Sequence, residues 1–84
     1  MPWQRELARR AIRDLEGLPT RDRRAVEAAI DRLVADPGSV DLAKLAGQSQ
    51  WRMRVGNWRV LLELDNAAGQ IRILRVLRRT STTY

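Results

Sequence analysis

The sequence predicts a small α+β domain in which two N-terminal helices pack on an antiparallel sheet built from the C-terminal half. Apolar residues recur at helical spacing between residues 7 and 33, whereas they alternate with polar residues between residues 51 and 77. Turn-forming residues separate the alternating runs. A chain of 84 residues is long enough for one domain, so residues 1–84 are interpreted as a single unit.

Two amphipathic helices account for the first part of the chain. The first is predicted to end near Gly17, and Thr20 is the expected N-cap of the second. The segment Asp36-Pro37-Gly38-Ser39 stops the second helix. The expected buried positions are Leu7, Ala8, Ala11, Ile12, Leu15 and Leu18 in the first helix, and Val26, Ala29, Ile30 and Leu33 in the second. The short link between them favours an antiparallel pair.

Two segments have a weaker pattern. Residues 1–6 have two readings, because Pro2 suits the first position of a helix while Trp3–Glu6 suits a short edge strand. Leu42, Leu45 and Ala46 are expected on a segment that links the helices to the sheet.

Three strands are predicted at about Trp51–Val55, Trp58–Asp65 and Gln70–Leu77. Gly56-Asn57 is a two-residue hairpin turn with glycine first, as a type II′ turn prefers. Residues 66–69 supply the second turn.

Folding the hairpin about its turn predicts the cross-strand neighbours. Val55 should lie opposite Trp58, Met53 opposite Val60, and Arg54 opposite Arg59. Trp51 and Trp58 then face the helices as packing residues, and Glu63 faces Arg72 on the other side of the sheet.

The composition excludes several classes of function. The chain has no cysteine and no histidine, so thiolate metal sites and Ser-His or Cys-His catalysis are excluded, and neither a metal nor a cofactor is expected. We find no signal-peptide pattern and no apolar run near the roughly 20 residues that span a bilayer. A cytoplasmic protein without a membrane partner is expected.

The positive charge is concentrated in the second half of the chain. Residues 1–44 hold nine basic and eight acidic side chains, a net charge of +1, whereas residues 45–84 hold seven basic and two acidic ones, a net charge of +5. Fifteen of the sixteen basic residues are arginine, which binds phosphate in a bidentate manner. This distribution indicates a polyanionic partner.

An arginine cluster is the candidate site. Alternation places Arg52, Arg54 and Arg59 on one face, and Arg78 and Arg79 follow the third strand toward the same end. Guanidinium groups could bind a phosphodiester and stabilise the charge that develops when an RNA 2′-OH attacks it. Arginines are poor general bases, so Tyr84 is the candidate for proton transfer. The competing interpretation is that these arginines are ordinary solvated surface charges.

Beyond these patterns, nearly the whole chain resembles the RelE/ParE superfamily of bacterial toxins from toxin–antitoxin pairs. The residues that carry the resemblance are Ala11-Ile12-Arg13-Asp14-Leu15-Glu16-Gly17-Leu18-Pro19, Leu42-Ala43-Lys44-Leu45-Ala46-Gly47, Trp51-Arg52-Met53-Arg54-Val55-Gly56-Asn57-Trp58-Arg59-Val60 and Arg75-Val76-Leu77-Arg78-Arg79. On this basis Trp3–Leu7 would be the first strand. Leu77-Arg78 departs from the Gly-His pair common in the family, and Arg54 replaces a lysine that some members have.

The resemblance implies the activity and the partners of the RelE branch. That activity is cleavage of messenger RNA in the ribosomal A site, leaving a 2′,3′-cyclic phosphate, and the neutralising partner is an antitoxin with a helical segment. Arg52, Arg54, Arg59, Arg79 and Tyr84 stand at the matching catalytic positions, with Arg78 as the near alternative to Arg79. Lys44, Arg72 and Arg78 are predicted as further RNA-binding residues.

Two other functions remain open at this level. The ParE branch shares the fold but inhibits DNA gyrase by protein contact, without the RNase residues. A non-enzymatic RNA-binding module would bind RNA with steep salt dependence and leave the strand intact.

Overall fold

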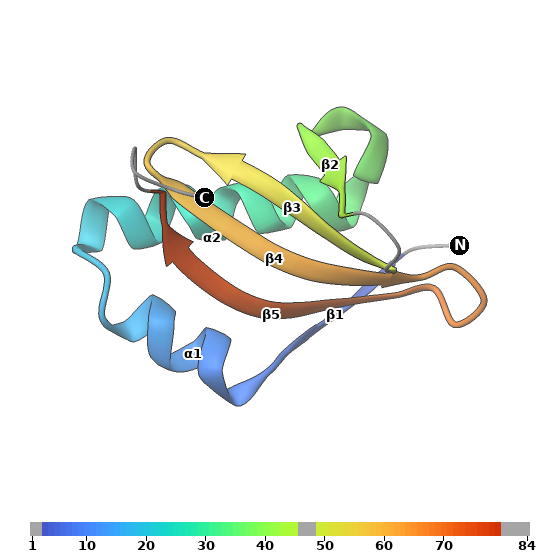
Figure 1. Cartoon of the computed structure of the whole chain (residues 1–84), viewed down its shortest axis with the longest axis horizontal. Coiled ribbons are helices and arrows are strands. Elements are labelled where there is room, and N and C mark those ends of the chain that lie inside the picture. The colour runs from blue at the N-terminus through green and yellow to red at the C-terminus, as the bar shows by residue number, and fades with distance from the viewer. Residues whose placement is uncertain (1–2, 46–48, 80–84) are drawn as a thin grey trace.

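The computed structural model describes residues 3–45 and 49–79 and shows two helices on one face of a sheet (Figure 1). The elements in chain order are β1 (Gln4–Leu7), α1 (Arg9–Glu16), α2 (Thr20–Ala35), the 3₁₀ turn η1 (Pro37–Ser39), β2 (Leu42–Lys44), β3 (Gln50–Val55), β4 (Trp58–Asp65) and β5 (Gln70–Arg78). The predicted α+β class, with its antiparallel helix pair and C-terminal meander, is confirmed.

The sheet has five strands in the order β1-β5-β4-β3-β2. All neighbours are antiparallel except β1, which runs parallel to β5. The central strands β4 and β5 therefore come from the predicted meander, and the two shortest strands lie at the edges.

The β3–β4 hairpin has the predicted register. Val55 pairs with Trp58, Met53 with Val60 and Arg54 with Arg59. Gly56 has a φ of 57°, a left-handed conformation that costs glycine little and other residues more. The next strand pairing is also as predicted, because Glu63 lies opposite Arg72.

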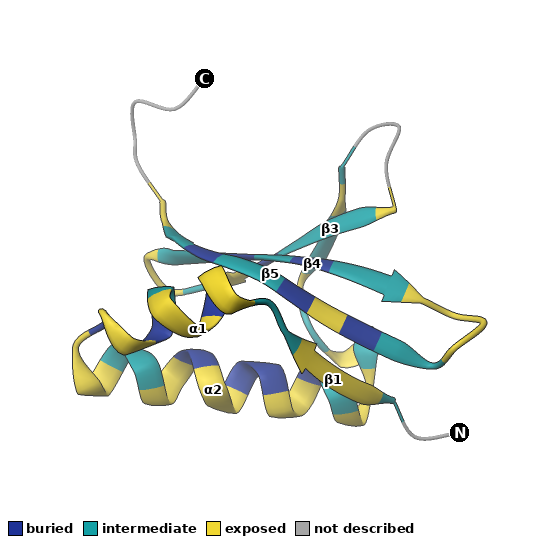
Figure 2. Cartoon of the chain, turned by 90° about the horizontal axis from the view of Figure 1, so that it is seen from below, coloured by how far each residue is buried: buried dark blue, intermediate teal, exposed yellow. Residues whose placement is uncertain are grey.

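The core lies between the helices and the sheet. The buried side chains are Ala11, Leu15, Leu18, Val26, Ala29, Ile30, Leu33, Met53, Val60, Leu62, Ile71, Ile73 and Val76. Figure 2 shows both helices under the same face of the sheet, with their buried residues turned toward it. Trp51 and Trp58 pack against this core, which confirms their predicted role.

Two predictions about the helices are wrong. The first helix begins at Arg9, because Leu7 belongs to β1 and Ala8 is the N-cap. Thr20 is not an N-cap: it is the first residue of α2, and Pro19 occupies the cap with an extended ψ of 146° and no side-chain hydrogen bond. Proline fixes φ near the helical value and has no N–H to leave unpaired, so it suits this position.

Ile12 is a further departure, since it was expected in the buried stripe but is 43% exposed. The helix α1 has only 8 residues, and the side chains buried within it are Ala11 and Leu15. The apolar stripe that periodicity predicts for α1 is therefore wider than the part of the helix that is buried against the sheet.

Two strands differ from the expected organisation. Leu42–Lys44 is not simply a linking segment, because it pairs with β3 and forms the edge strand β2. Of the two readings of the N-terminus, the strand is correct, and it pairs with Gln70–Ile73 of β5. Both segments are too short for periodicity to reveal, and their backbone hydrogen bonds come from strands distant in sequence.

One carboxylate joins α1 to the edge of the sheet. Asp14 Oδ2 accepts hydrogen bonds from Arg75 Nε at 2.8 Å and from the backbone N–H of Val76 at 2.9 Å. Burial acts to raise the pKa of Asp14, but the hydrogen bonds from Arg75 and Val76, with the charges of Arg75 and Arg10, bring it below its ordinary value.

This lowered pKa predicts how stability depends on pH. A carboxyl group whose pKa is lowered by folding stabilises the protein above its ordinary pKa of about 3.9, and this stabilisation is lost as the pH falls through the folded-state value. We expect the free energy of unfolding at pH 7 to be larger for the wild type than for Asp14→Asn. This difference between the two proteins should shrink below about pH 4. Urea denaturation at pH 7 and pH 3 measures it. A difference of equal size at both pH values would contradict the prediction.

Candidate functional site

The open side of the sheet carries a group of arginines near the β3–β4 turn. Because paired residues point to the same side, the pairs Arg54–Arg59 and Arg52–Leu61 place three arginines on one face. Figure 2 shows that α1 and α2 cover the opposite side. We call Arg52, Arg54, Arg59 and Arg79 the arginine face, and the position of Arg79 is described below.

The electrostatics of this face favour an anion. Arg54 lies directly opposite Arg59, which places two positively charged side chains side by side across the hairpin. The Nε atom of Arg52 is shielded from solvent and has no hydrogen-bond partner among the described residues. Buried polar atoms are usually paired, so this Nε is an exception to the rule.

Arg78 and Arg79 lie on opposite faces of the sheet. Arg78 pairs with Trp58 and therefore points to the side of the sheet that the helices cover. Arg79 continues past Leu77, which pairs with Arg59, so alternation returns it to the arginine face. Its backbone N–H bonds the carbonyl of Asn57 at 2.8 Å, and its Nη1 bonds the carbonyl of Gly56 at 3.2 Å. The structure thus favours Arg79 over the near alternative.

The other two predicted RNA-binding residues lie away from this group. Arg72 is on the same side of the sheet, but it is opposite Glu63, four residues along β4 from Arg59, or about 13 Å at the usual strand rise. It forms an ion pair with Glu6 at 3.2 Å, which offsets its charge. Lys44 pairs with Trp51, on the helix side, and its Nζ lies 5.9 Å from the centroid of that ring.

Tyr84 lies outside the described residues, so its predicted place beside the arginines is not tested. Two apolar residues of this surface were not among the predicted site residues: Leu61 and Leu77, which pair with Arg52 and Arg59 and are half-buried. Alternation from Arg59 to Leu61 could have revealed Leu61, whereas the place of Leu77 depends on its cross-strand pairing with Arg59. They give the aliphatic stems of the arginines an apolar surface to pack on.

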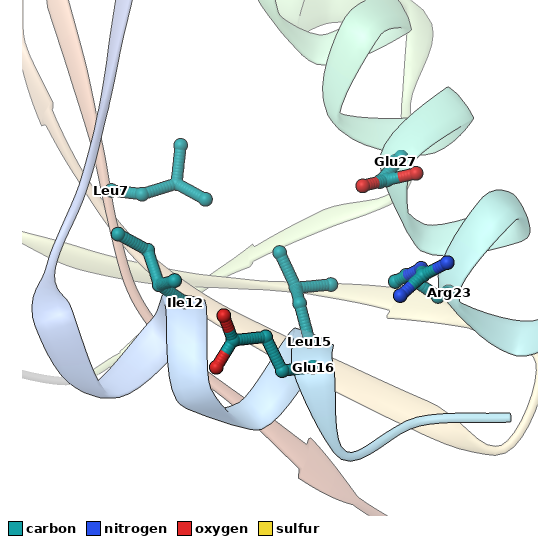
Figure 3. Close-up of a pocket in the computed structure, with 6 residues that line it drawn as sticks. All are labelled: Leu7, Ile12, Leu15, Glu16, Arg23 and Glu27. Carbon is teal, nitrogen blue, oxygen red and sulfur yellow. The ribbon is translucent and has the colours of Figure 1, made fainter. Parts of the chain in front are cut away.

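A hollow of about 310 Å³ lies between α1 and α2, away from the arginine face (Figure 3). Its lining residues are Leu7, Ile12, Leu15, Glu16, Arg23 and Glu27. None of the predicted site residues lines it, so we place the candidate site on the sheet. Within residues 3–45 and 49–79, no group of three or more acidic side chains is arranged to bind a metal ion. None of the described helices has the length and apolar character to cross a membrane.

Comparisons with known proteins agree with this fold. The model of the ParE toxin of the type II toxin-antitoxin system parDE matches residues 5–82. A search of curated protein sequences finds no match. Among solved structures, the toxin-antitoxin complex RelBE2 from Mycobacterium tuberculosis contains a chain 31% identical to this one. That match covers 94% of this chain and 100% of the other, with a TM-score of 0.77.

Two more distant structures share the fold. A chain of the RelE-RelB complex from the archaeon Pyrococcus horikoshii is 24% identical, with a TM-score of 0.84 over 98% of this chain and 100% of its own. The isolated RelE toxin of E. coli is 10% identical, with a TM-score of 0.77 over 95% of this chain and 87% of its own. The family match spans nearly the whole chain, and the chain therefore belongs to the RelE/ParE superfamily of toxins from type II toxin–antitoxin systems.

Proposed function

We propose that this toxin is a ribosome-dependent endonuclease that cleaves messenger RNA in the A site by attack of a 2′-OH on the adjacent phosphate. The observation that carries the proposal is the arginine face, which gathers four guanidinium groups at one end of an open sheet surface. The acidic side chains Glu6 and Glu63 lie around Arg72, and Glu63 is also the diagonal neighbour of Arg52 across β3 and β4, so the positive charge is greatest toward the turn. A polyanion is therefore attracted to the end of the sheet that holds the turn.

The geometry suits phosphoryl transfer. In this reaction the 2′ oxygen forms a bond to phosphorus, the 5′ oxygen leaves, and negative charge builds on the nonbridging oxygens. Arg54 and Arg59, side by side across the hairpin, are suited to bind those oxygens, and Arg52 lies two residues further along β3. Their charge stabilises the transition state more than the ground state, which is the source of the rate enhancement.

Proton transfer needs another group, because a guanidinium does not give up its proton near neutral pH. We propose Tyr84 for this role, on the resemblance to the RelE branch. The chain has no histidine, so an imidazole cannot take part. A tyrosine with a pKa near 10 makes a slow base, and we expect cleavage to accelerate as the pH rises from 6 to 9.

The partners follow from this activity. We propose that messenger RNA and the ribosome contact the arginine face in the cytoplasm, and that a helical segment of a cognate antitoxin neutralises the toxin. Structures similar to this chain are toxin-antitoxin complexes, which supports an antitoxin partner. No membrane, metal or cofactor is needed for this function.

A second candidate function is inhibition of DNA gyrase by protein contact. It is favoured by the match of residues 5–82 to the model of the ParE toxin. The arginine face favours the RNase instead, because inhibition by protein contact does not require guanidinium groups around one phosphate.

Primer extension on messenger RNA in purified translating ribosomes tests the proposal, with a gyrase supercoiling assay in parallel. New 3′ ends at A-site codons and unaffected supercoiling are the expected results. Inhibition of supercoiling without RNA cleavage would select the gyrase function. Salt-dependent RNA binding with neither effect would identify a non-catalytic RNA-binding module.

A further inference from the structure

Among residues 3–45 and 49–79, no strand pairs with the second half of β5 on the side where β1 pairs with its first half. Strand β1 covers β5 only over Gln70–Ile73, and the contact ends with a hydrogen bond from the Ala8 N–H to the Ile73 carbonyl at 2.8 Å. Beyond this point the chain turns into α1, which packs beside β5 (Figure 1). In the described part of the chain, the residues of β5 that lead to the arginine face therefore have no paired strand on this edge.

The pairing with β4 is also interrupted at the same point. Leu62 pairs with Ile73 and Leu61 pairs with Arg75, so Leu74 is an extra residue without a partner in β4. Such a bulge re-aims the residues that follow it. The residues from Arg75 to Arg78 pair with β4 again, so after the bulge β5 is held by β4 on one side and, on the other side, by whatever contacts Arg75 and Val76.

Asp14 is the side chain that secures it. Its Oδ2 accepts from the Val76 N–H at 2.9 Å and from Arg75 Nε at 2.8 Å, and Arg75 Nη2 lies 3.4 Å from Oδ1. The Asp14 side chain is only 19% exposed, so water competes weakly for these bonds. The Asp14 carboxylate thus accepts a backbone hydrogen bond from Val76, as a neighbouring strand would, and it also orients the side chain of Arg75.

We propose that Asp14 is a positioning residue for the arginine face. By fixing Arg75 and Val76 directly after the bulge, it sets the direction of β5 toward Arg79 and the turn at Gly56 and Asn57. The consequence for RNA binding rests on the proposed function, whereas the consequence for the position of Arg79 does not. In this way a residue of α1, on one side of the sheet, affects the arginine face on the other side.

Amide hydrogen exchange tests the position of Arg79 without any ligand. The comparison is between Asp14→Ala and Asp31→Ala, which removes the same charge from the ion pair between Arg5 of β1 and Asp31 of α2. We expect the exchange rate of the Arg79 amide, which bonds the Asn57 carbonyl, to rise about tenfold or more only in Asp14→Ala. The amides of β3 and β4 should keep their protection. An unchanged Arg79 amide, or an equal rise throughout the sheet, would overturn the proposal.

RNA binding tests the consequence for the site. The probe is a labelled single-stranded RNA of about 12 nucleotides, and affinity is measured over a range of salt concentrations at a temperature where every variant is folded. Losing one phosphate contact lowers the slope of log affinity against log salt by about 0.7. We expect Arg79→Ala and Asp14→Ala to show this same loss, and the double variant to show no further loss.

Asp31→Ala is the control for the RNA-binding experiment. Asp31→Ala should bind RNA with the wild-type slope, although its net charge rises by the same amount as in Asp14→Ala. A wild-type slope in Asp14→Ala, or additive losses in the double variant, would overturn the positioning role. If Arg59→Ala binds RNA as wild type does, the proposed function fails instead, and the exchange of the Arg79 amide still decides the role of Asp14.

Discussion

Replacing Arg59 by alanine is expected to lower the rate of A-site messenger RNA cleavage by about 10²–10³-fold, the usual effect of removing a group that stabilises transition-state charge. Arg59 lies at the centre of the arginine face, opposite Arg54 on one side and Leu77 on the other. Single-turnover cleavage on programmed ribosomes measures the rate, and circular dichroism confirms that the variant is folded.

The matched control is Arg24→Ala, which removes the same charge from an exposed position on α2, in the other layer of the molecule. Its cleavage rate should stay within about twofold of wild type, because a distant surface charge is screened by salt. Full activity in folded Arg59→Ala would show that Arg59 takes no part in cleavage. Equal losses of activity in the two variants would show that the arginines act only through the net charge of the protein.

The largest effect on stability is expected from Ile30→Ala. Ile30 is 2% exposed and packs between α2 and the sheet. Truncating a buried isoleucine removes its packing and leaves a cavity, so the free energy of unfolding should fall by about 2–5 kcal/mol. Domains of this size have only about 5–15 kcal/mol in total, so the loss is a large fraction. The melting temperature should fall by about 10 °C or more.

Ile12→Ala removes the same atoms from α1 and provides the control. Ile12 is 43% exposed, and alanine has the higher helix propensity, so the expected loss is below about 1 kcal/mol. Urea denaturation of both variants at pH 7 gives the comparison. An equal loss at the two positions would mean that Ile12 is buried in solution and that α1 packs differently from the structure.

Local pattern was sufficient for the central part of the fold. In the hairpin around Gly56, alternation and a two-residue turn leave one register that puts Met53 and Val60 on the same buried face. The same argument predicted that Arg52, Arg54 and Arg59 share the other face. The buried residues of α2 follow from a 3.6-residue period over 16 residues, which is long enough for the pattern to be clear.

The sequence by itself therefore determined the α+β class, the meander, the inward-facing tryptophans and the cluster of three arginines. Each of these depends on a period or a turn that lies within one continuous segment of the chain. The resemblance to the RelE/ParE superfamily added the first strand, which no local pattern could select.

Only the tertiary structure decided the rest, because it depends on contacts between segments far apart in the chain. The strand β2 exists through its pairing with β3, and β1 through its parallel pairing with β5. Consecutive strand residues face opposite sides, and the extra residue Leu74 together with the pairing of Leu77 with Arg59 decides that Arg79, not Arg78, is on the arginine face. The hydrogen bond from the Val76 N–H to the Asp14 carboxylate spans 62 residues. Such long-range hydrogen bonds have no period in the sequence, so they become visible only when the sheet and helices are assembled.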